Sequence, residues 1–434
     1  MSGSEDAVRR FTEDRWTAGI IGLGYVGLPL AMTASRAGLD VIGFDVAADR
    51  VAALSAGDSH VEDVGDDELR AAIASGARFT SHEADLAEAD AIFIAVPSPL
   101  GRNRQPDMSY IEAAAGTVSR IARAGQLIAL ESTTYPGTTD EHLLPAVATA
   151  GLTLDEDVFV AFSPERIDPG NALQTHEIPK IVGGVTETSG EVAAAAYGRI
   201  VERTHRVGSA RAAELTKLLE NTYRSVNIAL INELAQLAHA FDVDIWEVVD
   251  AAATKPFGFQ PFYPGPGVGG HCIPLDPQFL AWRARELRAP TRFIDLAEDV
   301  NIHMPDYVVS RVVEQLNGDG RSVKGARVLG VGVAYKRNIG DDRESPSRDV
   351  LSRLAQRGAT VGVHDPLVEP DRLARDGYEV VDALDAIEDW DLAIVLTDHD
   401  AVEYSALALS VPLVFDTRGV YRRLGLRHPN VVAL

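Results

Sequence analysis

The sequence predicts an α/β protein with two Rossmann-like parallel-sheet domains joined by a long central helix and a small helical domain. Short apolar runs alternate with helical stretches in the first half, and the same alternation returns after about residue 308. Between these halves, residues 209–241 contain neither proline nor glycine. The expected domains are residues 1–207, 208–308 and 309–434.

Five apolar runs in the first half predict strands, namely "AGII", "DVIGFDV", "ADAIFIAVP", "GQLIAL" and "DVFVAF". The third is expected to end at the prolines that follow Val96. The runs are short and continuously apolar, and helical stretches separate them. This pattern is typical of a parallel sheet that is covered on both faces.

The stretch 209–241 predicts one long helix because its apolar residues recur every three or four positions. These residues are Leu215, Leu218, Leu219, Thr222, Val226, Leu230, Leu234 and Leu237. A helix of this length exceeds what one small domain needs. We therefore expect it to link two domains and to carry a dimer interface.

Four apolar runs in the last third predict a second sheet, namely "ARVLGVGVAYK", "ATVGVHDP", "WDLAIVLTDHD" and "VPLVFDTRG". The segment "TVGVHDP" resembles "DVIGFDV", and "DLAIVLTD" resembles "ADAIFIAVP". The order of the segments is also similar. We interpret this as an internal duplication of a nucleotide-binding sheet, although parallel strands in general share such patterns.

Composition narrows the classes of function. The net charge of -24 argues against a nucleic-acid-binding surface. No run of 18 apolar residues predicts a membrane-spanning helix, and the polar N-terminus does not resemble a secretory signal. A single cysteine forms no internal disulfide, so we expect a cytoplasmic protein.

A glycine motif follows the first predicted strand. Gly22, Gly24 and Gly27 form G-x-G-x-x-G between a strand and a helix, and Asp45 follows the second strand. In a dinucleotide site the glycines allow a tight turn, close approach of a pyrophosphate and close helix packing. The acid binds the ribose hydroxyls and repels a 2′-phosphate, which favours NAD over NADP. The alternative is a tight turn without a ligand.

The only cysteine, Cys272, lies in "GPGVGGHCIPLDP" between Gly265 and Pro277. The glycines let backbone amides approach an anion, and a thiol held there is a candidate nucleophile. The alternatives are a small buried hydrophobic residue or a metal ligand. No further cysteine supports a metal site, so we predict none, although His271 is adjacent.

The basic residues are mostly arginine, and the only lysines are Lys180, Lys217, Lys255, Lys324 and Lys336. Lysine can lose its proton and act as a point donor, so each of the five is worth checking, although some will be ordinary surface residues. Lys217 and Asn221 are four residues apart in the long helix and share one face. Such a pair can position an alkoxide or a water molecule; the alternative is an exposed lysine.

Together these segments resemble the UDP-glucose/GDP-mannose dehydrogenase family of nucleotide-sugar 6-dehydrogenases, from about residue 18 to the C-terminus. The resemblance rests on "GLGYVGLPLA", "ESTTYPGTT", "FSPERIDPGN", "ELTKLLENTYRSVNIALINELA", "GPGVGGHCIPLDP" and "GVAYKRNIGDDRESPS". It implies an N-terminal NAD-binding domain, a central dimerisation domain with the catalytic loop, and a C-terminal domain that binds the UDP-sugar.

The resemblance also implies roles for individual residues. Catalytic positions match Cys272 as nucleophile, Lys217 and Asn221 on the helix, Asp276 as a proton-handling acid, Glu165 for thioester hydrolysis and Thr134 for a catalytic water. Cofactor positions match Gly22, Gly24, Tyr25, Val26, Gly27, Asp45, Arg50, Val96, Pro97, Thr134 and Arg343. Substrate positions match Glu165, Arg166, Lys217, Asn221, Tyr263, Gly269 and Lys336.

The implied reaction explains a single thiol in this loop. The family oxidises a primary alcohol at sugar C6 to a carboxylate with two NAD. An aldehyde intermediate does not readily release a second hydride, whereas the thiohemiacetal formed by a cysteine does, and the resulting thioester is hydrolysed. A thiol also holds more of its reactive anion near neutral pH than a serine hydroxyl does.

The sequence segments indicate the family more clearly than they indicate the branch, and hence the sugar. The segments around "SPERIDPGN" and before Cys272 favour the UDP-N-acetylglucosamine branch, with UDP-glucose and UDP-N-acetylmannosamine as alternatives. The acidic stretch before Trp16 is not a feature of the family. We expect a homodimer at least, with Lys255 and the "FGF" beside it as candidates for residues donated to a neighbouring subunit.

Two other classes of function are the alternatives. A one-hydride hydroxyacid dehydrogenase also uses a helix lysine with an asparagine four residues later, but it needs neither the cysteine nor a second α/β domain. An NAD-sensing scaffold without turnover would have lost a catalytic residue, and every matched position here holds the expected one.

Overall fold

The computed structural model describes residues 3–61, 63–101, 104–166, 175–270, 272–384, 387 and 389–434. The chain divides into two compact units. The first comprises Met1–Glu220 and Gln278–Ala289, and the second comprises Asn221–Pro277 and Pro290–Leu434. Helices α8 (Ala210–Ala240) and α10 (Cys272–Glu286) contribute residues to both units.

The first unit is built on an eight-stranded sheet with the order β3-β2-β1-β4-β5-β6-β7-β8. Neighbouring strands are parallel except for β6 and β7, which are antiparallel. The strands are β1 (Thr17–Ile21), β2 (Asp40–Phe44), β3 (Arg78–Thr80), β4 (Ala91–Ile94), β5 (Gln126–Leu130), β6 (Val158–Phe162), β7 (Lys180–Gly184) and β8 (Thr204–Val207). Its helices and short helical turns are α1 (Gly3–Glu13), α2 (Gly27–Arg36), α3 (Ala48–Ala56), α4 (Asp66–Ala74), η1 (Glu83–Glu88), α5 (Ser109–Ile121), η2 (Thr139–Leu143), α6 (Leu144–Thr149), η3 (Thr175–Glu177) and α7 (Glu187–Ile200).

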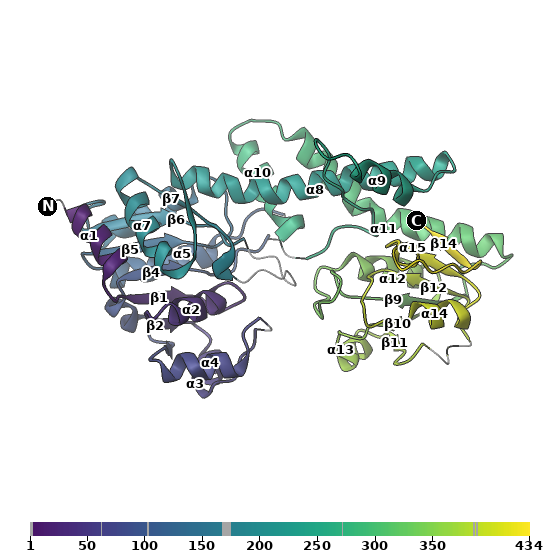
Figure 1. Cartoon of the computed structure of the whole chain (residues 1–434), viewed down its shortest axis with the longest axis horizontal. Coiled ribbons are helices and arrows are strands. Elements are labelled where there is room, and N and C mark those ends of the chain that lie inside the picture. Colours follow the sequence, from purple (N-terminus) through teal and green to yellow (C-terminus); the bar gives the residue numbers. More distant parts are fainter. Residues whose placement is uncertain are drawn as a thin grey trace. The chain divides into compact units, whose positions relative to one another are not determined.

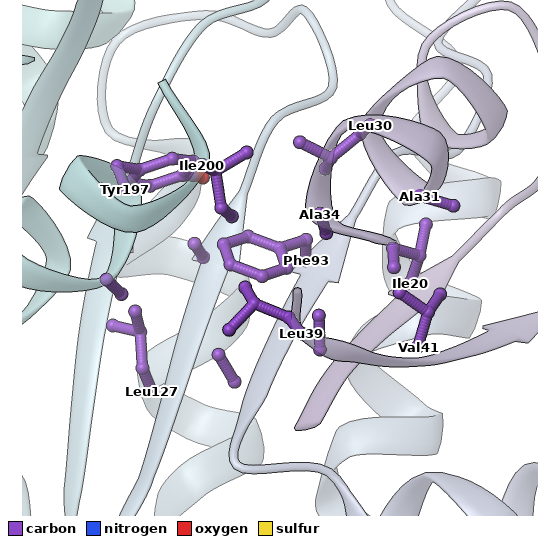
Figure 2. Close-up of a cluster of buried hydrophobic side chains, with 14 of the residues drawn as sticks. Ile20, Leu30, Ala31, Ala34, Leu39, Val41, Phe93, Leu127, Tyr197 and Ile200 are labelled. Atoms are coloured by element: carbon purple, nitrogen blue, oxygen red, sulfur yellow. The ribbon is translucent and has the colours of Figure 1, made fainter. Parts of the chain in front are cut away.

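Alternate side chains of each strand in this sheet serve two separate cores, because successive residues of a strand point to opposite faces. On one face, Ile20, Val41 and Phe93 pack with residues of α2 and α7 (Figure 2). Residues of α1 belong to the same core. On the other, Ile92 and Ile128 pack with α5, α6 and the first turn of α8. The predicted covering of both faces is therefore confirmed.

The acidic stretch before Trp16, which the family resemblance left unexplained, forms helix α1. The side chains of Phe11 and Trp16 are fully buried in the core beside α7. Arg10 pairs with Asp90 and donates to the carbonyl of Gly125 at 3.3 Å. Asp90 and Gly125 directly precede β4 and β5, so α1 lies at the amino ends of these strands.

The second unit holds a six-stranded, fully parallel sheet with the order β11-β10-β9-β12-β13-β14 (Figure 1). Its strands are β9 (Arg327–Val331), β10 (Thr360–His364), β11 (Glu379–Val380), β12 (Leu392–Val395), β13 (Val414–Asp416) and β14 (Val431–Ala433). Its other helices are α9 (Ile245–Ala253), α11 (Arg292–Gly318), α12 (Pro346–Gln356), α13 (Pro370–Arg375), α14 (Tyr404–Ser410) and α15 (Val420–Arg423). Helices α11 and α12 cover one face, and α14 and α15 cover the other.

The predicted fold class, with two Rossmann-like sheets and a long helix, is confirmed. The long helix was expected over residues 209–241, and α8 spans Ala210–Ala240. Strand β4 ends at Ile94, two residues before the expected end. Sequence reasoning did not anticipate strands β3, β7, β8, β11 and β14 or the 27-residue helix α11.

The expected boundary between residues 308 and 309 lies inside α11, whose interior includes the buried Pro305. The described chain forms two compact units rather than three. The division into three domains therefore stays a prediction.

Candidate active site

Several predicted cofactor residues follow neighbouring strands of the first sheet. Gly22 follows β1, Asp45 follows β2, Val96 comes shortly after β4, and Thr134 comes shortly after β5. Because the strands are parallel, these positions meet at one edge of the sheet. The strand order reverses between β1 and β4, which is where dinucleotides bind in such sheets.

The three glycines of the turn differ in how much space a side chain would have at each position. Gly22 has a φ of +92°, and a Cβ on it would lie 2.6 Å from the carbonyl oxygen of Ala95. A Cβ on Gly27 would lie 1.8 Å from the carbonyl oxygen of Gly22. A Cβ on Gly24 would meet nothing within 4 Å. The packing of the chain requires the first and third glycines, whereas the second leaves open space.

Asp45 is held as a carboxylate beside this turn. It accepts hydrogen bonds from the amides of Leu23 (3.0 Å) and Ala47 (2.9 Å) and from the guanidinium of Arg50 (2.9 Å). Burial alone would raise the pKa of Asp45, but the two amides and Arg50 lower it below the usual value. A carboxylate at this place is a natural acceptor for ribose hydroxyls.

Helix α2 begins directly after the glycine turn, and its N-cap residue, Val26, makes no side-chain capping bond. The amides of Leu28 and Leu30 already donate to the carbonyls of Gly24 and Val26 at 3.0 and 3.2 Å, and Pro29 has no N–H. The donors left for an anion are therefore the amides at the very start of the helix. With the open space at Gly24 and the ionised Asp45, these residues fit NAD: the amides would hold the pyrophosphate and Asp45 a ribose.

The other predicted cofactor residues divide between the two units. Tyr25 and Pro97 are exposed and Val96 is half-buried, all near the edge described above. The side chain of Thr134 is buried and bonded to that of Thr138. Arg343 belongs to the second unit, where it donates two hydrogen bonds to Asp341 at 2.8 and 2.7 Å.

Lys217 and Asn221 are both buried on α8, with relative exposures of 8% and 6%. The prediction that they share one face is confirmed, and the alternative of an exposed lysine is wrong. Within the described residues, Lys217 makes no hydrogen bond or ion pair. The amide of Asn221 donates to Oδ2 of Asp276. A buried ammonium without a protein partner is suited to an anionic ligand or oxyanion.

Cys272 is the first residue of α10 and not part of an extended loop, contrary to the expectation from its glycine- and proline-rich surroundings. The neighbouring Pro274 misled the prediction, because proline is tolerated in the first turn of a helix. Asp276 follows about one turn later and is buried, with an exposure of 2%. His271 and the side chain of Cys272 lie outside the described residues.

The glycines before Cys272 pack against the segment 335–346 of the same unit. A Cβ on Gly267 would lie 2.9 Å from the ring of Pro346. A Cβ on Gly269 would lie 2.9 Å from the carbonyl oxygen of Glu344, and one on Gly270 would lie 2.9 Å from the ring of Tyr335. Close packing alone therefore explains these glycines, and anion binding by them stays a prediction.

Two predicted substrate residues also lie in the second unit. The ring of Tyr263 stacks on Trp246, with centroids 5.6 Å apart and planes inclined by 14°. Its hydroxyl donates to Asp250 at 3.1 Å. Lys336 is half-buried in the segment that packs against the glycines.

Glu165 and Arg166 lie in the first unit, each in an ion pair. Arg166 donates to both carboxylate oxygens of Glu220, at 3.1 and 2.6 Å. Oε2 of Glu165 lies 3.0 Å from Nζ of Lys180, which also donates to Glu131 at 2.7 Å. Sequence reasoning named Lys180 without a role and missed Glu131. The signal for Glu131 was its place directly after β5, at the same edge as Thr134.

Glu214 is a second residue that sequence reasoning missed. Its buried carboxylate accepts from the amides of Gly137 (2.6 Å) and Thr139 (2.9 Å) and from the hydroxyl of Thr139 (2.7 Å). It thereby fastens the segment after Thr134 to α8, one turn before Lys217. Its place in the helix pattern, three residues before Lys217, was the available signal.

In the part of the chain that the structure describes, no group of three histidine, cysteine or acidic residues is arranged to hold a metal ion. No helix there is both long and apolar enough to cross a membrane.

Models of protein families match the chain in three successive segments. The UDP-glucose/GDP-mannose dehydrogenase family matches with its NAD binding domain at residues 17–201, its central domain at 211–303 and its UDP binding domain at 329–423. The resemblance stated from the motifs is thus confirmed, and the NAD binding domain bears out the predicted cofactor.

Individual relatives agree. The chain is 37% identical to a UDP-N-acetyl-D-glucosamine 6-dehydrogenase of Pseudomonas aeruginosa, covering 80% of this chain and 82% of that protein. It is 36% identical to an NDP-N-acetyl-D-galactosaminuronic acid dehydrogenase of Ralstonia nicotianae, covering 93% and 96%. A solved structure of a UDP-D-ManNAc dehydrogenase from Pyrococcus horikoshii has a TM-score of 0.87 at 29% identity, covering 96% and 98%.

These relatives share the reaction type and differ in the sugar that their names state. The prediction of an NAD-dependent oxidoreductase acting on nucleotide sugars is therefore confirmed at the level of the family. The chain belongs to the UDP-glucose/GDP-mannose dehydrogenase family, a family of NAD-dependent UDP-sugar dehydrogenases.

Proposed function

We propose that this chain oxidises the C6 hydroxymethyl group of UDP-N-acetylglucosamine to a carboxylate in a four-electron reaction with two NAD. The sequence segments around Glu165 and before Cys272 support this sugar, as does the P. aeruginosa relative named for it. Other relatives are named for different N-acetylated sugars. UDP-N-acetylmannosamine and UDP-glucose are therefore the alternative substrates.

The observation that carries the proposal is the set of polar groups on α8 and in the N-terminal part of α10. Lys217 is buried without a partner among the described residues, and Asn221 lies one turn later on the same helix. Asn221 is bonded to Asp276, which follows Cys272 by one turn of α10. An ammonium, an amide, a carboxylate and a thiol are the groups that this oxidation needs.

The chemistry assigned to the chain follows from these groups. NAD, when bound, supplies the hydride acceptor for both oxidations. The Cys272 thiolate adds to C6 of the aldehyde, so that this carbon becomes tetrahedral and again carries a hydrogen that can leave as hydride. The ammonium of Lys217 stabilises the negative charge on the C6 oxygen. A helix N-terminus favours the thiolate form of a cysteine.

Hydrolysis then releases the product. Water adds to the thioester carbon, the carbon–sulfur bond breaks, and the thiol is regenerated with a proton from that water. We assign the removal of this proton to Glu165, the positioning of the water to Thr134 and Asn221, and proton exchange to Asp276. Lys336, Tyr263, Arg166 and Gly269 are assigned to the UDP-sugar, and Arg343 to the cofactor.

We further propose that the chain acts as a homodimer through α8. Leu230, Leu234 and Leu237 follow one stripe of this helix and Phe241 comes directly after its end, and each is 39% to 74% exposed. A second copy of the chain would cover the stripe by an isologous contact. The single cysteine supports the expectation of a reducing compartment, the cytoplasm.

The test is the number of NADH molecules formed per sugar, with limiting UDP-N-acetylglucosamine, UDP-N-acetylmannosamine or UDP-glucose in parallel. Two NADH from UDP-N-acetylglucosamine, with the other two sugars slower, would support the proposal in full. Two NADH from another sugar would keep the reaction and correct the substrate. One NADH per sugar would remove the role of Cys272.

A further inference from the structure

A buried lysine lies between two carboxylates in the first unit. Nζ of Lys180 is 2.7 Å from Oε2 of Glu131 and 3.0 Å from Oε2 of Glu165. The side chains of Lys180, Glu131 and Glu165 are only 7%, 0% and 14% exposed. The Coulombic attraction between charges this well shielded from water is stronger than that between surface charges, and it offsets the cost of burying them.

The sheet fixes this arrangement. Strands β6 and β7 are the only antiparallel neighbours among the described strands, with Phe162 opposite Gly183. Continuing this register places Glu165 opposite Lys180, and the Ser163 hydroxyl donates to the carbonyl of Ile181 at 2.7 Å between them. The contact therefore follows from strand pairing and not from a flexible surface side chain.

Glu131 is held from the other side. The hydroxyl of Tyr197, on α7, donates to Oε1 of Glu131 at 2.7 Å. The Lys180 ammonium also lies 5.6 Å from the centroid of the Tyr197 ring. Glu131 is therefore a fixed acceptor that competes with Glu165 for the charge of Lys180.

The charges of the three groups are coupled. Burial alone would lower the pKa of Lys180, but Glu131 and Glu165 raise it, so the amine stays an ammonium. Burial raises the pKa of Glu131, and the charge of Lys180 opposes this. One cation thus serves two carboxylates.

We propose that Lys180 is a positioning residue that holds Glu165 as an oriented carboxylate for thioester hydrolysis, and that Glu131 sets how much of the lysine charge acts on Glu165. The inference rests on the proposed function, which gives Glu165 its role. Glu165 takes one proton from the attacking water and passes it to the departing sulfur. Lys180 itself transfers no proton.

Among the described groups that face Glu165, Lys180 lies on β7 and Glu131 at the end of β5. The amide of Arg166 donates to Oε1 of Glu165 at 2.6 Å, while its guanidinium is engaged by Glu220. Removing the charge of Lys180 and removing the charge of Glu131 therefore have opposite electrostatic effects on Glu165.

The experiment compares Lys180→Met, Lys180→Arg and Glu131→Gln with the wild type. Rapid quenching follows the NADH burst and the release of the sugar acid between pH 5 and 9, with the sugar that gives two NADH. We expect Lys180→Met to keep a burst near two NADH per subunit but to release acid about tenfold more slowly or worse, since a general base contributes 10²–10⁴-fold. Lys180→Arg is expected to restore most of the rate.

The pH dependence separates positioning from a merely structural role. The acidic limb of acid release should move to higher pH in Lys180→Met and to lower pH in Glu131→Gln. The double variant Lys180→Met/Glu131→Gln removes both buried charges, so it should fold even if Lys180→Met alone does not. It should still release acid slowly. Lys324→Met, at an exposed lysine in the second unit, is the matched control and should change nothing.

The inference would be overturned if the acidic limb moved in the same direction in Lys180→Met and in Glu131→Gln, or if the folded double variant released acid at the wild-type rate. Either result would leave the four-electron reaction intact. If the wild type forms no NADH from any of the three sugars, the proposed function fails, and the inference falls with it. The two failures are distinguished because the first is seen only in variants and the second in the wild type.

Discussion

The two sheets of this chain share their strand order and their first turn, but the segments after that turn differ. In both, the order reads third, second, first, fourth, fifth, sixth for the leading strands. The amide of Gly22 donates to the carbonyl of Phe44 at 2.9 Å, and the amide of Gly332 donates to that of His364 at 2.8 Å. Both glycines have positive φ, +92° and +81°.

After the turn, the first sheet leaves open space beside the chain, whereas in the second sheet the corresponding position is buried. Two residues beyond Gly22 stands Gly24, whose missing side chain leaves space, whereas two residues beyond Gly332 stands the fully buried Ala334. Helix α2 begins at Gly27, but the next helix in the second sheet begins only at Pro346. The second turn therefore offers no helix N-terminus to a pyrophosphate.

The acids that follow the second strand of each sheet differ in the same way. Asp45 accepts from two amides and from Arg50, whose side chain is 41% exposed and free to turn away. Asp365 accepts from four amides, those of Val333, Ala334, Leu367 and Val368, at 2.7 to 3.1 Å. The ring of the fully buried His399 also lies 3.3 Å from it.

The fold alone therefore does not make a dinucleotide site. In the first sheet, Asp45 can exchange its partner Arg50 for a ribose. In the second sheet, Asp365 holds the protein's own loops, which include the segment that carries Lys336. We therefore expect NAD to bind the first sheet only.

The largest expected effect separates the two acids. Asp365→Ala leaves four amides without an acceptor and should lower the free energy of unfolding by about 3 kcal/mol, without weakening NAD binding to the folded protein. Asp45→Ala should cost only about 1 kcal/mol of stability but weaken NAD binding at least tenfold. Urea denaturation and fluorescence titration with NAD measure the two quantities. Equal losses of NAD affinity would break the comparison.

A pH experiment sharpens the contrast. Burial alone would raise the pKa of Asp365, but the His399 ring and the amides of Ala334 and Leu367 lower it from 3.8 to about 2. Because the folded pKa is depressed, the carboxylate stabilises the fold above about pH 4, and this stability is lost as the pH falls toward 2. The loss is roughly 2 kcal/mol.

The matched measurement is the unfolding free energy of the wild type and of Asp365→Asn at several pH values. The advantage of the wild type should shrink between about pH 4 and 2. An advantage that does not change with pH would show that folding does not lower the pKa of Asp365.

A smaller effect tests the open space at Gly24. Gly24→Ala adds a methyl group that meets no protein atom within 4 Å, so the unfolding free energy should stay within about 0.5 kcal/mol of the wild type. The same methyl group occupies the space of the pyrophosphate, and the Kd for NAD should rise about tenfold, or about 1.4 kcal/mol. Gly65→Ala, another position with no neighbour within 4 Å, is the control for both quantities.

The sequence revealed those parts of the molecule that depend on local pattern. The glycine turn at Gly22, the acid after β2 and the leucine periodicity of α8 are all readable along the chain, and each was predicted. Helix α11 was missed because Pro305 interrupts its pattern, although burial of this residue in the packed helix offsets the cost.

The network of Lys180 was beyond sequence reasoning for a different reason. Its members Glu131, Lys180 and Tyr197 are far apart in the chain, and only the antiparallel pairing of β6 with β7 brings Lys180 opposite Glu165. No local pattern predicts that pairing. The burial of Lys217 without a partner likewise depends on tertiary packing, so the sequence could name the residue but not its state.

The proposed function makes the single thiol essential for the second oxidation, and the variant Cys272→Ser removes that thiol alone. The measurement is sugar acid released per UDP-sugar, with NADH counted in the same sample, using the sugar that the wild type oxidises. We expect two NADH and one acid for the wild type, and no acid for Cys272→Ser, because the hydroxyl is a far weaker nucleophile at neutral pH. Acid release by Cys272→Ser at the wild-type rate would contradict the proposed function.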